Sequence, residues 1–257
     1  MQKILAHIGG SRQYRSILRH ISIANNTNIN FMAENLHSKL FDTCYVQKPN
    51  IILYPGVEYT QEIHNFIVQK SREVQIVLYL DRPVQPVDLF KFWSDAGCKI
   101  VSYNRAASMA SDVLECDMFY DDSIFTIIPN LARNCKIAVS LSIDNKKNHE
   151  LLDSVLYPTQ KEYNLVLFNN PEFKNPQNIG IYNEPDLNYI LNTFEYFVDV
   201  DQEFSLEAAV CGIKNLDINN NTIIDALINQ QYIKPILADK NKCSNFVNNE
   251  LIKYMGI

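Results

Sequence analysis

Short apolar runs and amphipathic segments alternate along almost the whole of this 257-residue chain. Runs rich in β-branched and aromatic residues, such as those at 50–54 and 75–79, are typical of buried strands. The segments between them, such as 12–24 and 60–72, have the spacing of amphipathic helices. Because strands that alternate with helices form parallel sheets covered by helices on both faces, the pattern predicts an α/β fold.

The alternation falls into two series, which predict two Rossmann-like domains. We place an N-terminal domain at residues 1–130 and a C-terminal domain at residues 131–257, with a hinge near Pro129 and Asn130. The less regular segments are expected to form a short helix over 106–114, edge strands over 118–120 and 125–128, and closing helices over 223–230 and 241–254.

Charge and composition narrow the classes of function. The formal net charge is −6, and the chain has no run of lysine and arginine that would neutralise the phosphates of duplex DNA. Arg12, Arg15 and Arg19 form a small basic group, which we interpret as a solvated helix face. We therefore expect no face for duplex nucleic acid.

The cysteines and the apolar runs indicate the compartment. None of the six cysteines forms a C-x-x-C pair, so zinc-binding spacing is absent, and several lie in apolar patterns as buried free thiols do. We expect a reducing, cytoplasmic setting, with no signal peptide. No run of 18 apolar residues occurs, so we expect no transmembrane segment.

The most specific stretch is 196–213, which predicts a buried strand, a short acidic loop and a helix closed by glycine. The hydroxyl of Ser205 can cap the helix by accepting a hydrogen bond from a backbone N–H of the first turn. Glu207 then lies in that turn, near the positive end of the helix dipole. Gly212 suits the left-handed position that ends a helix. A carboxylate held in this way can accept hydrogen bonds from two ribose hydroxyls.

The sequence Leu206-Glu207-Ala208-Ala209-Val210-Cys211-Gly212 resembles a segment of GT-B glycosyltransferases, whose helix reads roughly Leu-Glu-Ala-x-Ala-x-Gly. The resemblance implies a compact GT-B-like fold, with two Rossmann-like domains facing a cleft. It also implies that Glu207 binds the ribose of a nucleotide-sugar donor, with Ser205 beside it. Asp199 stands where the family carries a second acidic residue near the donor sugar, and Glu203 lies between. We take Asp199 and Glu203 as candidate catalytic residues.

Two more strand-to-helix turns carry candidate residues, because ligands of open α/β sheets bind beyond the carboxyl ends of strands. Gly9 and Gly10 follow the first strand, where glycine lets the backbone approach a ligand, and His7 is a candidate catalytic base. The resemblance implies that this turn faces the acceptor and the donor phosphates, and it makes the final helix a candidate to cross back to the first domain. The resemblance places the turn containing Tyr182 and Asn183 near the nucleotide base. The pair Lys146 and Lys147 is the candidate for binding the diphosphate.

Asp199-Val200-Asp201 admits a different interpretation, because two carboxylates in this spacing can chelate Mn²⁺ or Mg²⁺, as in GT-A glycosyltransferases. Those enzymes place the motif near mid-chain, whereas here it lies close to the C-terminus. We expect a glycosyltransferase that needs no metal or other cofactor and moves a sugar from a nucleotide-sugar to an unknown acceptor. The alternatives are a nucleotide-sugar epimerase-like enzyme and a non-catalytic nucleotide- or sugar-binding protein.

Overall fold

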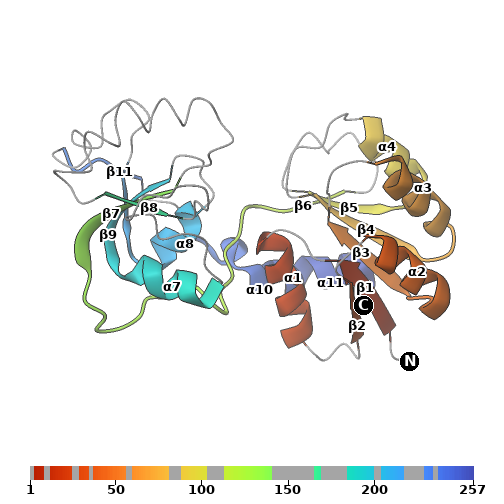
Figure 1. The fold of residues 1–257 in the computed structure, drawn as a ribbon, viewed down its shortest axis with the longest axis horizontal. Coiled ribbons are helices and arrows are strands. Elements are labelled where there is room, and N and C mark those ends of the chain that lie inside the picture. Colours follow the sequence, from red (N-terminus) through yellow and green to blue (C-terminus); the bar gives the residue numbers. More distant parts are fainter. Residues whose placement is uncertain are drawn as a thin grey trace. The chain divides into compact units, whose positions relative to one another are not determined.

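The computed structural model divides the chain into two compact units (Figure 1). The first unit comprises Met1–Tyr120 and Asp239–Ile257, and the second comprises Asp121–Ala238. The structure describes residues 3–8, 12–24, 29–34, 37–55, 60–80, 88–102, 113–140, 165–168, 184–199, 204–216, 229–233 and 237–257.

The first unit is built on a six-stranded sheet with the order β2-β1-β3-β4-β5-β6, and every neighbouring pair is parallel. This order confirms the first predicted Rossmann-like unit, with its topological reversal between β1 and β3. The strands are β1 (Lys3–Ile8), β2 (Ile29–Glu34), β3 (Ile51–Pro55), β4 (Gln75–Leu80), β5 (Lys99–Ser102) and β6 (Val113–Glu115). The helices are α1 (Arg12–Ile23), α2 (His37–Gln47), α3 (Gln61–Lys70) and α4 (Asp88–Asp95).

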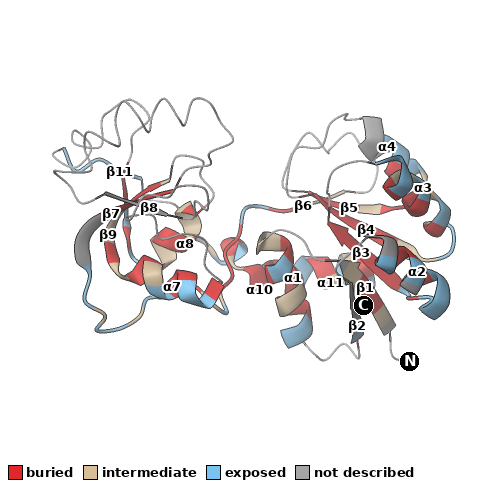
Figure 2. Ribbon diagram, viewed as in Figure 1, coloured by how far each residue is buried: buried red, intermediate tan, exposed pale blue. Residues whose placement is uncertain are grey.

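Alternate residues of these strands enter two separate apolar layers, so the sheet is buried on both faces (Figure 2). Leu53 and Val77 face α1 and the C-terminal segment, while Ile52 and Leu78 face α2, α3 and α4. This two-sided burial explains why the strands are continuous apolar runs in the sequence.

The C-terminal segment belongs to the first unit. It contains η3 (Asp239–Asn241), α10 (Cys243–Phe246), a π-helical turn η4 (Val247–Leu251) and α11 (Ile252–Met255). Its buried side chains complete the α1 face of the sheet. Its backbone is fixed as well, because Tyr120 N–H donates to Asn241 O at 2.9 Å and Cys243 N–H donates to Tyr120 O at 3.0 Å.

The second unit contains a five-stranded sheet with the order β11-β10-β9-β7-β8, parallel except for the pairing of β10 with β11. The order reverses between β7 and β9, so the second predicted Rossmann-like unit is confirmed as well. The strands are β7 (Asn134–Ser140), β8 (Leu165–Phe168), β9 (Phe194–Asp199), β10 (Lys214–Leu216) and β11 (Tyr232–Ile233). The helices described here are α7 (Glu184–Asn192) and α8 (Ser205–Val210).

The chain enters the second unit earlier than the predicted boundary at residue 130. Thr126 N–H donates to the Asn188 side chain at 3.2 Å, and Ile128 N–H donates to that of Asn192 at 2.9 Å. These bonds hold the connecting segment against α7, and the structure divides the chain after Tyr120 instead. The predicted cleft concerns the arrangement of the two units and stays a prediction.

Several predicted elements differ in the structure. Val113 and Leu114, at the end of the helix predicted over 106–114, form a strand instead, because they pair with β5 as its parallel neighbour, and residues 106–112 lie outside the described part of the chain. Residues 125–128 form no strand, since their polar backbone groups bond to side chains of α7. Residues 118–120 make only an isolated bridge, between Tyr120 and Lys242. The predicted helix over 241–254 is divided by the π-helical turn. Residues 223–228 lie outside the described part of the chain, and 229–230 form a turn.

Candidate functional site

The carboxyl ends of β7 and β9 meet at the point where the strand order of the second sheet reverses. Ser140, the last residue of β7, is in register with Asp199, the last residue of β9. Open α/β sheets bind ligands beyond the strand ends at such a reversal. The sheet topology therefore puts Asp199, and the helix that follows it, at the position where this fold holds ligands.

The Asp199 carboxylate joins the end of β9 to the start of α8. Its Oδ2 atom accepts hydrogen bonds from Phe204 N–H at 2.8 Å and from the Ser205 hydroxyl at 2.7 Å. The predicted cap was therefore wrong: Ser205 is the first helical residue, and its hydroxyl donates to Asp199 instead of accepting from the backbone. The catalytic role of Asp199 and the donor-binding role of Ser205 stay predictions.

Glu207 lies in the first turn of α8, as predicted, and only 4% of its surface is exposed. Cys211 lies one turn further along. Burial raises the pKa of the Cys211 thiol to about 12, and the negative charge of Glu207 adds to that rise. The carboxylate is thus held inside the unit near the start of the helix, where the helix dipole favours a negative charge.

Gly212 ends α8 in the predicted left-handed conformation, with φ of 73°. Ile213 N–H donates to Ala208 O at 3.0 Å and Gly212 N–H to Ala209 O at 2.9 Å, which is the bonding pattern of a Schellman motif. A Cβ atom at Gly212 would lie 3.1 Å from Nη2 of Arg133, so the turn leaves little room for a side chain.

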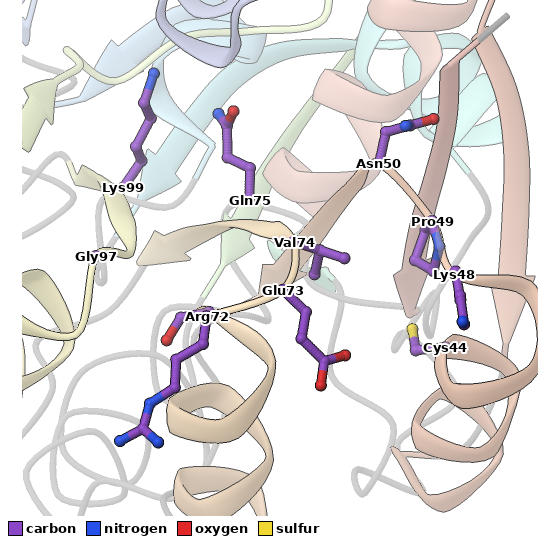
Figure 3. A pocket seen from close by; sticks show the side chains of 11 residues that line it. Cys44, Lys48, Pro49, Asn50, Arg72, Glu73, Val74, Gln75, Gly97 and Lys99 are labelled. Atoms are coloured by element: carbon purple, nitrogen blue, oxygen red, sulfur yellow. The ribbon is translucent and has the colours of Figure 1, made fainter.

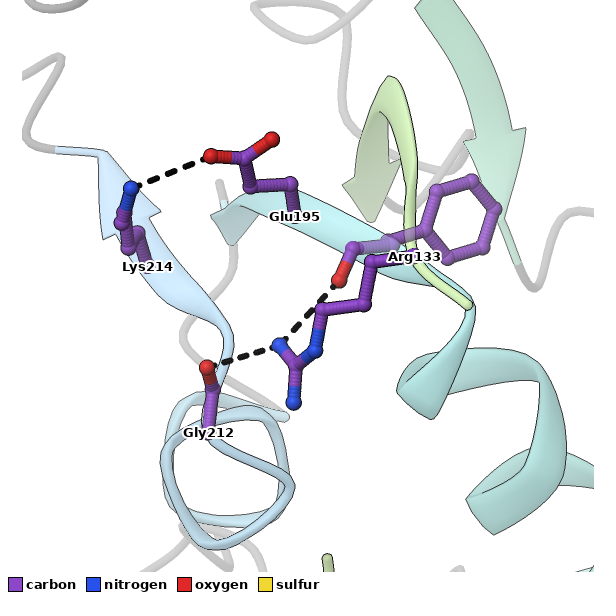
Figure 4. A network of polar contacts seen from close by, with 5 residues as sticks. Arg133, Glu195, Gly212 and Lys214 are labelled. Atoms are coloured by element: carbon purple, nitrogen blue, oxygen red, sulfur yellow. Dashed lines mark hydrogen bonds and ion pairs between the residues drawn. The ribbon is translucent and has the colours of Figure 1, made fainter. Parts of the chain in front are cut away.

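Two side chains that the sequence analysis did not single out hold α8 to the sheet. Arg133, just before β7, donates to the carbonyl oxygen of Gly212 at the end of the helix (Figure 4), and it also donates to that of Cys211. Asn215 on β10 donates to Ser205 O at 3.0 Å. Neither residue lies in a local motif, because each bond joins segments that are distant in the sequence or that meet only through the fold.

His7 lies at the corresponding reversal of the first sheet, where β1 pairs with Leu53 of β3 and with Ala33 of β2. Leu53, its partner on β3, accepts a hydrogen bond from the Tyr14 hydroxyl at its carbonyl oxygen, at 2.6 Å. His7 therefore lies one residue before the carboxyl end of β1, and its role as a base stays a prediction.

The other predicted site residues lie outside the described part of the chain. They are Gly9, Gly10, Lys146, Lys147, Tyr182, Asn183 and Glu203, together with Asp201 of the alternative metal motif. Among the residues that the structure does describe, no three His, Cys, Asp or Glu side chains gather as a metal ion would require. Within the same ranges, no helix is both long and apolar enough to cross a membrane.

An open cavity of about 770 Å³ lies at the opposite edge of the first sheet, where β3, β4 and β5 begin (Figure 3). Its polar side chains bond to neighbouring segments: Gln75 donates to Met255 O at 3.0 Å, Asn50 accepts from Ile4 N–H at 2.9 Å, and Lys99 donates to Tyr254 O. These contacts fix the C-terminal segment and β1, so the cavity has a structural explanation and lies away from the carboxyl ends of the strands.

No protein-family model matches the sequence, and no curated protein matches it either. The fold is similar to that of solved structures. MnaA from S. aureus, solved with UDP, aligns with a TM-score of 0.56 at 12% identity, over 99% of this chain and 90% of that chain. A protein assigned as a UDP-N-acetylglucosamine 2-epimerase from Listeria monocytogenes aligns at 0.55 and 11%, over 99% and 91%.

The UDP-GlcNAc 2-epimerase from Neisseria meningitidis, solved with UDP-GlcNAc, aligns with a TM-score of 0.51 at 10% identity, over 99% of this chain and 93% of that chain. At such low identities the similarity describes the fold. It confirms that this chain has the predicted GT-B-like α/β fold with two sheets.

Proposed function

We propose that this protein is an enzyme that acts on a nucleotide-sugar, with the nucleotide held at the carboxyl end of the second sheet. Glu207 accepts hydrogen bonds from the ribose hydroxyls in this proposal. The reaction depends on positioning the sugar and on stabilising the departing diphosphate, with no metal ion required.

One observation carries the proposal. The strand β9 ends where the strand order reverses, and the next described helix in the sequence, α8, holds a buried carboxylate in its first turn. A carboxylate at this edge, in a helix turn where the dipole favours a negative charge, can accept hydrogen bonds from the hydroxyl groups of a ligand. Accepting ribose hydroxyls is the role that the Leu-Glu-Ala resemblance implies for it.

Two reactions fit this proposal. Transfer of the sugar to an acceptor is favoured by the segment 206–212, which resembles that of GT-B glycosyltransferases. Epimerisation of the sugar is favoured by the structural similarity to proteins named as UDP-GlcNAc 2-epimerases, which extends over 99% of this chain. Both reactions use the same nucleotide half of the substrate, so the binding site can be tested before the reaction is known.

Calorimetric titration with UDP-, GDP-, ADP- and CDP-sugars tests the binding site. Glu207→Ala should weaken binding of the preferred donor about tenfold or more, because each hydrogen bond to a charged group contributes roughly 1.5–3 kcal/mol. Glu195→Gln is a suitable control, since Glu195 lies in the same unit and forms a partly exposed ion pair with Lys214 at 3.1 Å (Figure 4). Equal affinity of Glu207→Ala and the parent protein would remove the proposed ribose contact.

Proton NMR of UDP-GlcNAc incubated with the protein then separates the reactions. An epimerase changes the sugar signals without an acceptor, whereas a transferase releases UDP faster when its acceptor is added. EDTA should leave binding and turnover unchanged. Loss of activity that Mn²⁺ restores would contradict the metal-independent proposal and favour Asp199 and Asp201 as ligands.

A further inference from the structure

We infer that Arg133 is a positioning residue for Glu207, acting through the end of α8. The inference rests on the proposed function, because it concerns how the ribose-binding carboxylate is held. It assigns no contact between Arg133 and the nucleotide.

The Arg133 guanidinium connects three elements of the second unit. Nη1 donates to Gly212 O at 2.7 Å and to Phe194 O at 3.3 Å (Figure 4), and Nη2 donates to Cys211 O. Phe194 is the first residue of β9, and Arg133 itself directly precedes β7. One side chain therefore fixes the end of α8 against the two strands whose opposite ends form the candidate site. A planar guanidinium is suited to this role, because it presents several donors in a fixed geometry.

The fixed point is connected to the backbone of Glu207 through one residue, Cys211. The carbonyl oxygen of Cys211 accepts from Arg133, and the N–H of Cys211 donates to Glu207 O at 2.9 Å. The helix spans only Ser205–Val210, so the bonds at its end lie about one turn, roughly 5.4 Å, from Glu207.

The start of the helix is held separately, by Asp199 and by Asn215. Loss of the Arg133 bonds would leave the carbonyl groups at the end of α8 without these donors, and the Cys211 thiol, which donates to Asn188, would remain as a contact there. A carboxylate that binds two hydroxyls must be placed to within about 0.5 Å, so even a small rotation of this short helix would disturb the ribose contacts.

Selectivity for ribose is the measurement that separates positioning from stability. The dissociation constants of UDP and of 2′-deoxy-UDP would be measured calorimetrically for the parent, Arg133→Gln and Arg133→Lys. We expect the parent to bind UDP several-fold more tightly than the deoxy analogue, Arg133→Gln to lose most of that ratio, and Arg133→Lys to keep part of it. Arg72→Gln, an exposed arginine of the first unit, should keep the ratio of the parent.

A double-mutant cycle with Glu207→Gln tests the coupling. Once Glu207→Gln has removed the selectivity, adding Arg133→Gln should change the ratio no further. A parent that binds both nucleotides equally would overturn the proposed function and this inference with it. A selective parent together with an equally selective Arg133→Gln variant would overturn the inference alone. If circular dichroism shows that Arg133→Gln does not fold, the ratio of the two dissociation constants measured for Arg133→Lys decides whether the inference holds.

Discussion

Gly212 combines two constraints that can be separated by experiment. Its φ of 73° lies in the left-handed region, and a Cβ atom there would approach the Arg133 side chain to 3.1 Å. Gly97 ends α4 with φ of 91° but has nothing within 4 Å of the corresponding Cβ position. The two glycines thus share the backbone requirement, and only Gly212 adds a steric one.

We therefore expect Gly212→Ala to destabilise the protein more than Gly97→Ala does. The left-handed conformation alone costs an L-residue roughly 1–2 kcal/mol, and at Gly212 the displacement of Arg133 adds to that loss. Urea unfolding of both variants measures the free energy of unfolding. Equal losses for the two variants would show that the contact with Arg133 has no energetic weight.

Three buried thiols should make the free energy of unfolding depend on pH above pH 9. Burial raises the pKa of Cys98, of Cys116 and of Cys211 from 9.0 to about 12 in each case. Their stabilising contribution is complete below pH 9. It declines as the pH rises from 9 towards 12, because the thiols ionise first in the unfolded chain and this ionisation favours unfolding. Each thiol lowers the free energy of unfolding by up to about 1.4 kcal/mol per pH unit in this range.

The expected result is a free energy of unfolding that falls more steeply above pH 9 in the parent than in Cys98→Ala. The variant is less stable at pH 7 because it leaves a cavity, but it lacks one of the ionising thiols. Urea titrations at pH 7, 9, 10 and 11 give both slopes. Identical slopes would contradict the raised pKa of Cys98.

At the scale of elements, two asparagine side chains of α7 form hydrogen bonds with residues 126 and 128, in the connecting segment that precedes β7. Asn192 is 1% exposed, accepts from Ile128 N–H at 2.9 Å and donates to Thr126 O at 2.9 Å. Asn188 accepts from Thr126 N–H and from the Cys211 thiol. These side chains supply the hydrogen bonds that a neighbouring strand would otherwise provide.

Asn192→Ala should therefore cost about 0.5–1.5 kcal/mol for each hydrogen bond lost, because it removes the partner of partly buried backbone groups at 126 and 128. Hydrogen exchange should report faster exchange of the Ile128 amide. Tyr189→Ala, at an exposed position of the same helix, is the control and should leave that amide protected. An unchanged exchange rate in Asn192→Ala would contradict the role assigned to this side chain.

Local patterns in the sequence were enough to predict most of the elements and the glycine that ends α8. The apolar runs of β3 and β4 are long and buried on both faces, so their signal is strong. The segments 118–120 and 125–128 have similar β-forming residues, but their hydrogen bonds go to Asn241, Asn188 and Asn192. Such partners are set by tertiary structure, and no local pattern reveals them.

The candidate site was predictable only where its residues belong to a local pattern. Glu207 and Gly212 follow from a helix signal with a known start and end. Arg133 and Asn215 act on carbonyl oxygens of another element, and an isolated Arg or Asn in a sequence carries no sign of such a partner.

At the scale of the whole molecule, the second unit is inserted into the first. The sheet of the first unit is formed before residue 120, but one of its faces is completed by Cys243, Phe246, Val247, Leu251 and Met255. Removing residues 239–257 would expose apolar surface of β1, β3 and β4. The first unit would lose about 25 cal/mol of stabilising free energy for each Å² of apolar surface that returns to water.

A protein ending at Ala238 should therefore lose the cooperative unfolding of its first unit and bind a hydrophobic dye. A protein ending at Met255 keeps all five buried side chains and is the control. Dye fluorescence and thermal unfolding compare the two. A cooperative transition of the first unit in the shorter protein would show that the C-terminal segment is dispensable for its core.

This insertion has a consequence for the order of events on the ribosome. The segments that build the sheet of the first unit emerge early, yet they cannot bury one face until the last helices have been translated. Residues 121–238 are made in between, which takes roughly 6 to 24 s at about 5–20 residues per second. During that interval the nascent chain presents an incomplete apolar face to chaperones, while the inserted unit already has its own sequence in full.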